Sequence, residues 1–242
     1  VVFSGGHGSS LVYSLLHLWG YDVSLDDLKN FRQLGSKTPG HPEYGHTPGV
    51  EVTTGPLGQG FANAVGFAFA SAYAAHLLNN PTAKVIDHKV YCFCGDGDLE
   101  EGISYEAASL AGHHALSNLV VVYDSNNITI EGEATIALSE NIRGRFESQG
   151  WAVLEIDGHD YMQIEKAFSE AVSGKSGKPT LIIAKTKIAK GSATMEGSHH
   201  THGAPLGEDE IKASKTAAGF DGESKFNIPE DVLIRFRCAK EK

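Results

Sequence analysis

Short apolar segments that alternate with helical patterns are the feature that most restricts how this chain can fold. The apolar, partly β-branched runs that predict buried strands are residues 90–94, 119–123, 152–156 and 181–184. Apolar residues at spacings of three and four predict helices over residues 10–19, 61–78, 102–113, 139–149 and 161–172. Strands that alternate with helices favour βαβ units. The sequence therefore predicts an α/β fold, with a parallel β-sheet flanked by helices on both faces.

The composition restricts the partners of the chain. With 242 residues and 41% hydrophobic content, the chain can bury a sizeable core in one large domain or two small ones. A formal net charge of -10 without a run of Lys or Arg argues against nucleic acid and against acidic membrane surfaces. The sequence has no stretch of 18 apolar residues, so we expect no membrane partner.

The cysteines favour a reducing compartment. Cys92 and Cys94 share one face of a predicted strand, but they are too far apart along it to form a disulfide readily. No second Cys pair or suitably spaced His pair accompanies them or Cys238, which argues against a zinc site. We expect a cytoplasmic protein. The chain starts at Val1 without an initiator Met, so an organellar signal stays an open alternative.

Asp96 lies in a Gly-Asp-Gly turn that directly follows one predicted strand and precedes a helical segment beginning near Leu99. In an open α/β sheet this position is the carboxyl end of a strand, where ligands bind. Gly95 and Gly97 allow the backbone to approach a phosphate, and the next helix presents free N–H groups to an anion. Taken alone, such a tripeptide is also compatible with a plain tight turn.

Asn126 makes the Gly-Asp-Gly turn more informative, because it immediately follows the next predicted strand. One βαβ crossover separates the two turns, so parallel strands bring a carboxylate and a carboxamide to the same edge of the sheet. Both groups are oxygen donors suited to Mg²⁺ or Ca²⁺. A backbone carbonyl just past Asn126 and two diphosphate oxygens would fill most of an octahedral coordination shell.

Two irregular stretches, residues 34–60 and 190–206, interrupt the helical and strand patterns. Long irregular segments inside a compact domain are usually functional or disordered. The second stretch contains His199, His200 and His202, but it lacks the helical His pair and general-base Glu of a typical zinc site. We therefore do not expect zinc there.

Four motifs, in order along the chain, resemble those of transketolases, a family of thiamine diphosphate-dependent enzymes. They are KTPGHPE at 37–43, TTGPLGQG at 53–60, GDGDLEEGIS at 95–104, and GS at 191–192 with HGAPL at 202–206. The Gly-Asp-Gly turn followed by Asn126-Asn127 also resembles the diphosphate-binding signature of thiamine-dependent enzymes in general. The resemblance runs from His7 to about Leu206. It implies the thiamine diphosphate-binding fold, with the chain as its diphosphate domain.

The resemblance also implies roles for residues at matching positions. A divalent metal, Mg²⁺ or Ca²⁺, would be held by Asp96, Asn126 and the carbonyl of Ile128. The sugar-facing catalytic residues would be His7, His41 and His202. The residues implied to bind thiamine diphosphate are His7, Gly55, Pro56, Leu57, Gly95, Asp96, Gly97, Asn126, Ile130 and His202.

Two glutamates, Glu101 and Glu106, resemble the family's carboxylates at the subunit interface, where a proton network joins the paired active sites. Without the resemblance they would be unremarkable carboxylates on a helix surface. The resemblance thus implies a homodimer of the full-length enzyme.

The implied reaction is the reversible transfer of a two-carbon ketol unit from a ketose phosphate to an aldose phosphate, as in the pentose phosphate pathway and the Calvin cycle. Sugar phosphates would be the substrates. Imidazoles titrate near neutral pH and can move protons in both directions. The cofactor is the electron sink, so the protein supplies positioning, electrostatics and proton transfer.

The resemblance divides the chain into a thiamine diphosphate and metal-binding domain at residues 1–217 and a polar edge at 218–242. The second part would lead, as a linker, toward a pyrimidine-binding domain. Transketolases begin earlier, with a motif that carries another substrate histidine, and their pyrimidine domain supplies an activating glutamate. We therefore expect an N-terminally incomplete domain that needs a pyrimidine-binding partner for activity.

Related functions remain as alternatives. One is a cofactor-binding subunit or fragment that is inactive without its partner, and another is a dihydroxyacetone synthase-like enzyme with the same chemistry. The form of residues 55–60 disfavours a deoxyxylulose-phosphate synthase. Residues 40–43 disfavour the α-subunit of a 2-oxo-acid dehydrogenase.

Overall fold

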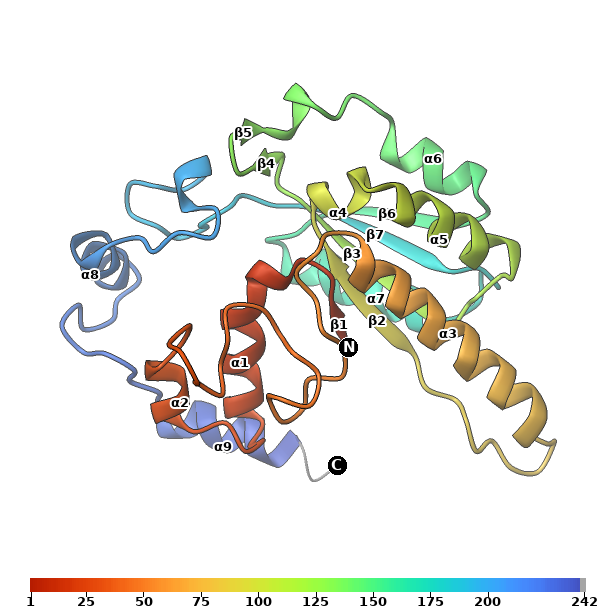
Figure 1. Cartoon of the computed structure of the whole chain (residues 1–242), viewed down its shortest axis with the longest axis horizontal. Coiled ribbons are helices and arrows are strands. Elements are labelled where there is room, and N and C mark those ends of the chain that lie inside the picture. The colour runs from red at the N-terminus through yellow and green to blue at the C-terminus, as the bar shows by residue number, and fades with distance from the viewer. Residues whose placement is uncertain (240–242) are drawn as a thin grey trace.

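A parallel sheet forms the centre of the structure, a computed structural model that describes residues 1–239. Within this range the sheet has five strands in the order β1-β2-β3-β7-β6, and each neighbouring pair is parallel (Figure 1). The strands are β1 Val2–Phe3, β2 Val90–Cys94, β3 Leu119–Ser125, β6 Ala152–Asp157 and β7 Thr180–Lys185. The predicted α/β fold with a helix-flanked parallel sheet is confirmed.

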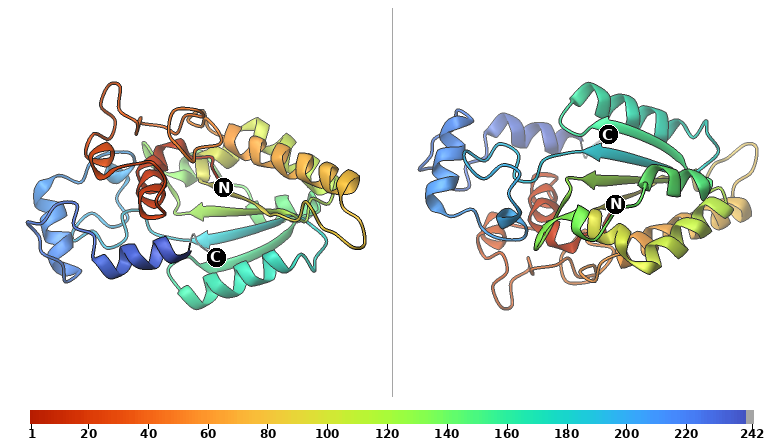
Figure 2. Two further views of the ribbon diagram at one scale, coloured as in Figure 1. Left: turned by 90° about the horizontal axis from the view of Figure 1, so that it is seen from below. Right: turned by 90° about the horizontal axis from the view of Figure 1, so that it is seen from above.

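Helices cover both faces of this sheet (Figure 2). Helices α3 and α5 pack together on one face, and α7 packs against β6 on the other. The helices are α1 Ser9–Leu18, α2 Leu25–Lys29, α3 Gln59–Leu78, α4 Asp96–Glu100, α5 Gly102–His113, α6 Ile142–Ser148, α7 Tyr161–Ser173, α8 Glu208–Ala217 and α9 Glu230–Ala239. Short 3-10 turns are Gly6–Gly8, Ala134–Ile136 and His199–Thr201, and β4 Ile128–Thr129 pairs with β5 Gly132–Glu133 as a small hairpin.

The side chains of β3 alternate between two apolar clusters, as expected for a strand covered on both faces. Leu119 and Val121 join the cluster under α3 and α5, whereas Val120 and Val122 join the one under α7. All four are at least nine-tenths buried. This two-sided burial explains why the predicted strands are continuously apolar.

Trp151 fixes α5 and α6 above the sheet. Its ring is 2% exposed, and its Nε1 atom donates a hydrogen bond of 2.8 Å to the carbonyl of Ala108 in α5. It also packs edge-on against Phe146 of α6 at 5.1 Å between ring centroids, and lies 6.1 Å from Phe61 of α3. Trp151 thus packs the three helices α3, α5 and α6 against one another.

Three elements differ from the prediction. Two of them are too short to give a periodic pattern, and the third begins later than expected. β1 has two residues, and α2 has five, held by a capping box between Ser24 and Asp27. The helix predicted from residue 139 begins at Ile142, because Asn141 acts as its N-cap and accepts a hydrogen bond from the Gly144 amide. The other predicted strands and helices are found, with ends that shift by up to two residues.

The segment from residue 218, expected to be a polar edge leading to a linker, contains an additional helix within the described residues. Helix α9 packs against α1 (Figure 1). Arg237 donates hydrogen bonds to the carbonyls of Leu18 and His17, and Phe236 lies 6.2 Å from the ring of Trp19. The sequence pattern did not predict this helix, because it forms through its packing against α1. The last expected linker residues, 240–242, lie outside the described part.

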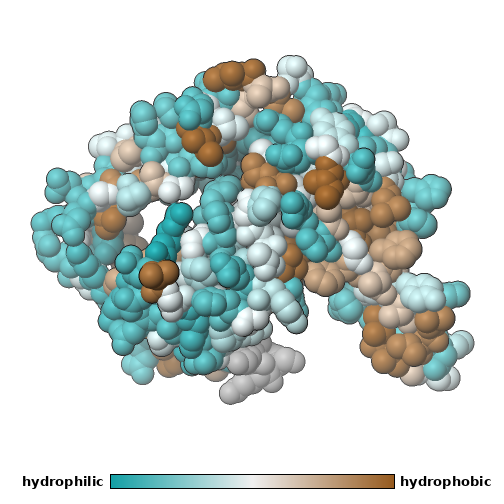
Figure 3. Space-filling model, viewed as in Figure 1, coloured by the Kyte–Doolittle hydropathy of each residue, from teal (hydrophilic) through white to brown (hydrophobic). Residues whose placement is uncertain are grey.

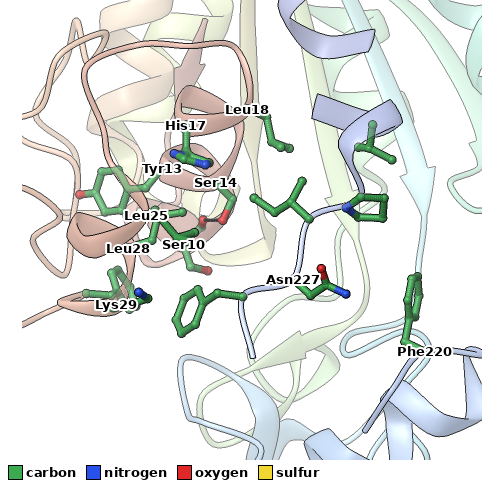
Figure 4. Close-up of a pocket in the computed structure, with 15 residues that line it drawn as sticks. Ser10, Tyr13, Ser14, His17, Leu18, Leu25, Leu28, Lys29, Phe220 and Asn227 are labelled. Carbon is green, nitrogen blue, oxygen red and sulfur yellow. Dashed lines mark hydrogen bonds between the residues drawn. The ribbon is translucent and has the colours of Figure 1, made fainter. Parts of the chain in front are cut away.

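An apolar cavity of 730 Å³ lies between helices α1 and α2 on one side and residues 220–232 on the other. Tyr13 and His17 face it from α1, while Phe220 and Asn227 face it from the C-terminal segment (Figure 4). Its lining, taken over the described residues, includes none of the predicted site residues. The C-terminal segment and the N-terminal helices therefore pack against each other without filling the space between them.

Helix α3 is, within residues 1–239, the one helix long and apolar enough to cross a membrane by length and composition. A core helix of a soluble protein passes the same test. Phe61, Ala64, Val65 and Ala68 of α3 are buried in the cluster that it shares with β2 and α5. This packing is that of a helix on a sheet.

Candidate functional site

The predicted site lies where β2 and β3 end side by side. Cys94, the last residue of β2, is in register with Tyr123 of β3, so the turns that follow both strands reach the same edge of the sheet. Gly95 leads directly into α4, which begins at Asp96 rather than near Leu99 as expected. The first helical turn after Gly95 therefore contains Asp96 itself, and α5 starts only at Gly102.

Asp96 has one satisfied and one unsatisfied carboxylate oxygen. The side chain is 5% exposed, and the Tyr123 hydroxyl donates a hydrogen bond of 2.5 Å to its Oδ1 atom. The buried Oδ2 atom has no hydrogen-bond partner among the described residues. Burial raises the pKa of Asp96, hydrogen bonds from the Tyr123 hydroxyl and the Asn127 backbone oppose this effect, and the charges of Asp124 and Glu100 add to it. A cation at Oδ2 would remove this cost, which fits a divalent metal.

Asn126 follows β3 at the same edge. Its Oδ1 atom accepts a hydrogen bond of 2.9 Å from the Ile128 amide, and its Nδ2 atom donates one of 3.1 Å to Asp124. Asn127 has a φ of 61°, a left-handed conformation that reverses the chain into the β4–β5 hairpin. Ile128 thus starts the hairpin beside Asn126, and β4 contacts α4. Ile130, the other predicted contact here, is 69% exposed.

The residues that could hold a metal are few. The described residues contain no group of three His, Cys, Asp or Glu side chains placed to bind one. A cation at Asp96 would therefore depend on neutral oxygens, such as the Asn126 carboxamide and the Ile128 carbonyl, and on oxygens from a ligand. That donor set suits Mg²⁺ or Ca²⁺ carried with a diphosphate.

Glycines bring the loop before α3 into contact with the turn after β2. A Cβ atom at Gly97 would lie 2.9 Å from Cδ1 of Leu57, and one at Gly6 would lie 2.8 Å from the Gly55 amide nitrogen. Gly58 adopts a left-handed φ of 75° as the N-cap of α3. The segment that contains His7 thus contacts the Gly55 to Leu57 loop, which in turn contacts the Gly95 to Gly97 turn.

Two of the predicted histidines are in direct contact. The rings of His7 and His202 lie 4.6 Å apart between centroids, although the residues come from opposite ends of the chain. His41 covers Gly55, where an added Cβ atom would be 3.4 Å from its Cγ. The turn before His41 is anchored by Ser9 and Tyr13 of α1, which donate hydrogen bonds to the carbonyls of Gly40 and Pro39.

The environment favours neutral imidazoles at this site. Burial of part of the ring lowers the pKa of His7, and the neighbouring His41 lowers it further, while Asp98 and Asp124 partly offset these effects. Burial also lowers the pKa of His202, and so does the proximity of His7. Neutral imidazoles near pH 7 can accept protons from a bound hydroxyl compound and return them.

The loop that carries His202 is fastened to α8 by a glutamate that the sequence motifs do not include. Glu210 accepts hydrogen bonds from the Ser192 hydroxyl and from the amide and hydroxyl of Thr194. These hydrogen bonds lower the pKa of Glu210 to about 2. Asp98 lies inside the third motif, but the motif analysis gave it no role, although its place in the third position of a helix after a glycine is a capping signal.

Glu101 and Glu106, predicted at a subunit interface, are both exposed in the single chain. Glu101 is the N-cap of α5, and Glu106 lies within that helix. A Cβ atom added at Gly58 would be 2.8 Å from the Cβ atom of Glu101. Among the other histidines, His199 and His200 stack at 4.1 Å between ring centroids.

Comparisons with known proteins find a family model and close relatives for this chain. A family model described as transketolase, thiamine diphosphate binding domain, matches residues 1–242. A transketolase from Geobacillus stearothermophilus is 53% identical over 242 residues, which are all of this chain and 36% of that protein. The chain thus spans little more than a third of the curated relatives that it matches.

Solved structures share the fold closely. A crystal structure of transketolase from Campylobacter jejuni has a TM-score of 0.95 and 62% identity, and the match covers 99% of this chain and 37% of that one. A transketolase from Pichia stipitis in complex with sedoheptulose-7-phosphate has a TM-score of 0.96 and 47% identity, with 99% and 36% covered.

Proposed function

This chain belongs to the transketolase family as its thiamine diphosphate binding domain, and we propose that it serves the transfer of a two-carbon ketol unit. The donor would be a ketose phosphate and the acceptor an aldose phosphate. One observation carries the proposal. The rings of His7 and His202 are in contact, and close approaches at glycines connect the His7 segment to the turn that contains Asp96. The sugar phosphate bound in the Pichia stipitis structure supports the substrate class.

We assign the divalent metal to Asp96, Asn126 and the carbonyl of Ile128. The unsatisfied Oδ2 atom of Asp96 supports this assignment, because a buried carboxylate oxygen without a partner is costly unless a cation approaches it. Gly95, where an added Cβ atom would meet nothing within 4 Å, would leave room for the diphosphate, and the first amides of α4 would point toward it. When bound, thiamine diphosphate supplies the electron sink for carbon–carbon bond cleavage and formation.

His7, His41 and His202 would bind the sugar hydroxyls and move protons at them. The lowered pKa values of His7 and His202 support this role, because a neutral imidazole can accept a hydroxyl proton at pH 7. These residues would act in the forward and reverse directions alike.

A homodimer of the full-length protein is the second part of the proposal. Exposed apolar side chains gather on the outer half of α3, over the lower right of the molecule in Figure 3. Phe67, Phe69, Tyr73 and Leu77 are each at least 41% exposed there, and Leu110 of α5 is 47% exposed. Large exposed apolar patches mark protein interfaces. Glu101 and Glu106 would come to lie at this interface, and a pyrimidine-binding domain would face the cofactor across it.

We also propose a cytoplasmic setting for the protein. All three cysteines are free in the described residues, which suits the reducing cytoplasm. Sugar-phosphate interconversion of the pentose phosphate or Calvin type would be the route that uses such a transfer.

A coupled-enzyme assay of ketol transfer tests the proposal. The chain is assayed with thiamine diphosphate and Mg²⁺, with and without the pyrimidine-binding segment of the same protein. We expect transfer only when both are present, and a loss of at least about tenfold in kcat for His202→Ala. His88→Ala, an exposed loop histidine, is the matched control and should retain activity.

Two outcomes would count against the proposal. Cofactor binding without transfer, even with the second segment, would identify a noncatalytic cofactor-binding subunit. Transfer with formaldehyde as the preferred acceptor would identify a dihydroxyacetone synthase-like enzyme.

A further inference from the structure

Asp98 is a buried acidic residue that neither the metal assignment nor the histidine pair explains. It lies in α4 two residues after Asp96, and it is only 1% exposed. No salt bridge involves it within the described residues. A buried carboxylate is costly unless hydrogen bonds compensate for the lost water, so its partners are informative.

Both oxygens of Asp98 accept hydrogen bonds, and the donors come from three separate segments. Oδ1 accepts from the Ser4 hydroxyl at 2.6 Å and from the Gly58 amide at 2.8 Å. Oδ2 accepts from the Gly95 amide at 3.0 Å. Hydrogen bonds to a charged acceptor are the stronger kind, so this one side chain joins regions up to 94 residues apart in sequence.

Ser4 extends this network into the sheet and into α3. Its amide donates to the Phe93 carbonyl in β2, and its hydroxyl accepts from the Phe61 amide at 2.9 Å. A Cβ atom at Gly60 would lie 2.5 Å from the Ser4 Cα atom, so the two backbones are in tight contact. The main-chain carbonyl of Asp98 in turn accepts from the Ser104 hydroxyl of α5 at 2.5 Å.

The three segments joined at Asp98 are the ones that carry the proposed site. Ser4 precedes His7, Gly58 ends the loop with Gly55 to Leu57, and Gly95 starts the turn of Asp96. We propose that Asp98 is the positioning residue of the cofactor site, holding the His7 segment, the Gly58 turn and the Gly95 turn against one another. The expected effect of Asp98 on cofactor binding rests on the proposed function. The hydrogen bonds of Asp98 do not, because all of them lie within this chain.

The charge of Asp98 also acts on His7. The groups that affect the pKa of His7 are Asp98 and Asp124, which raise it, and His41, which lowers it along with burial. His202, in ring contact, is the remaining titratable neighbour. Removing the negative charge of Asp98 should therefore lower the pKa of His7. A residue with a purely structural role would not produce this electrostatic change.

Asp98→Asn is the first test, because the amide keeps the size of the side chain but replaces one acceptor oxygen with a donor. We expect the Mg²⁺-dependent affinity for thiamine diphosphate to fall at least about tenfold, as for loss of a charged hydrogen bond. In the cofactor-free protein, the nuclear magnetic resonance titration of His7 should shift to lower pH. The Gly58 and Gly95 amides should exchange with solvent faster than in the wild type.

Ser4→Ala is the second test, for the case in which Asp98→Asn does not fold. It removes one donor but keeps the Asp98 charge, so cofactor affinity should fall several-fold while the His7 pKa should not fall. Asp87→Asn, an exposed loop aspartate near Lys84, is the matched control and should change neither. Unchanged cofactor affinity and amide exchange in both the Asp98 and Ser4 variants, with an unchanged His7 titration in Asp98→Asn, would overturn the proposal.

Failure of the proposed function would be distinguishable from failure of this inference. If the wild-type protein does not bind thiamine diphosphate, the proposed function fails at that step. The His7 titration and the exchange of the Gly58 and Gly95 amides, both measured without cofactor, would still confirm or overturn the role of Asp98.

Discussion

At the scale of single residues, burial of the Asp96 carboxylate destabilises the fold in a way that a bound cation would offset. Its pKa is raised above the unfolded value, so the ionised carboxylate opposes folding at neutral pH. Its Oδ2 atom is buried without a partner. The stability of the metal-free protein should therefore increase as pH falls through this raised pKa.

Asp96→Asn tests that balance. The variant removes the buried charge but keeps an oxygen for the Tyr123 hydroxyl, so the free energy of unfolding of the metal-free protein should rise by up to about 1 kcal/mol. Magnesium-dependent cofactor binding should fall at least about tenfold. Thermal unfolding and calorimetry measure the two effects. A less stable variant that still binds with magnesium would contradict this account.

The histidine pair gives a second prediction at this scale. His7 and His202 should titrate below the value of about 6.5 that is usual for histidine, because burial disfavours the imidazolium form. Since both pKa values are lowered in the folded state, their contribution to stability is present at neutral pH and is lost as pH falls below that value.

Removal of one ring should change the titration of its neighbours. His7→Ala should raise the pKa of His202, and His41→Ala should raise that of His7, because each removes a neighbouring positive charge. Ring-proton chemical shifts followed against pH measure both. Unaltered titration of His202 in His7→Ala would show that the 4.6 Å ring contact is absent in solution.

Some functional residues could be identified from the sequence and others could not, for a physical reason. Asp96 and Asn126 could be identified because each directly follows a strand of the same parallel sheet, so local pattern and topology are enough to pair them. Asp98 and Glu210 could not, because their partners are set by tertiary packing. Asp98 bonds to Ser4 across 94 residues, and Glu210 bonds to Thr194 in a loop segment without a helix or strand.

At the scale of elements, helix glycines show where two segments approach too closely for a side chain. Gly112 and Gly66 both lie inside helices, but a Cβ atom at Gly112 would be 1.7 Å from the Gln149 carbonyl oxygen. At Gly66 the same atom would meet nothing within 4 Å. The packing of α5 against the end of α6 thus requires glycine, whereas α3 does not.

Gly112→Ala and Gly66→Ala should therefore have opposite effects. The first should lower the free energy of unfolding by about 2–4 kcal/mol through overpacking. The second should raise it by up to about 1 kcal/mol, because alanine favours the helix. Denaturant unfolding measures both changes. Equal effects of the two substitutions would show that α5 does not pack on the Gln149 turn.

Element prediction succeeded where periodicity extends over several turns or a full strand. β2 and α5 have the ends that the sequence predicts. β1, with two residues, and α2, with five, are too short for a periodic signal, and they form because neighbouring segments pair with them or cap them. Helix α9 forms against α1, so its presence depends on tertiary contact.

At the scale of the whole molecule, the exposed apolar surface on α3 predicts a partner. Tyr73 on this surface is 61% exposed, and Tyr161, at the start of α7 on the opposite side of the sheet, is 85% exposed. Tyr73→Glu should weaken dimerisation of the full-length protein at least about tenfold, because it places a charge in an apolar interface. Tyr161→Glu should not. Sedimentation velocity would detect the difference, and equal behaviour of the two variants would argue against this interface.

The architecture as a whole was the most predictable level. Alternating apolar runs and helical patterns leave few alternatives to a parallel sheet with helices on both faces, and the sheet edge then determines where ligands can bind. The seam between residues 220–232 and α1 was not predictable, since it depends on how a polar segment returns to a distant helix.

The most direct test of the central claim is the location of the metal. Crystals of the protein grown with thiamine diphosphate and Mn²⁺ in place of Mg²⁺ would be measured by anomalous diffraction. We predict a metal peak within about 2.0–2.3 Å of Asp96 Oδ2, Asn126 Oδ1 and the Ile128 carbonyl oxygen. A cofactor bound with its metal elsewhere, or no metal peak beside Asp96, would contradict the claim.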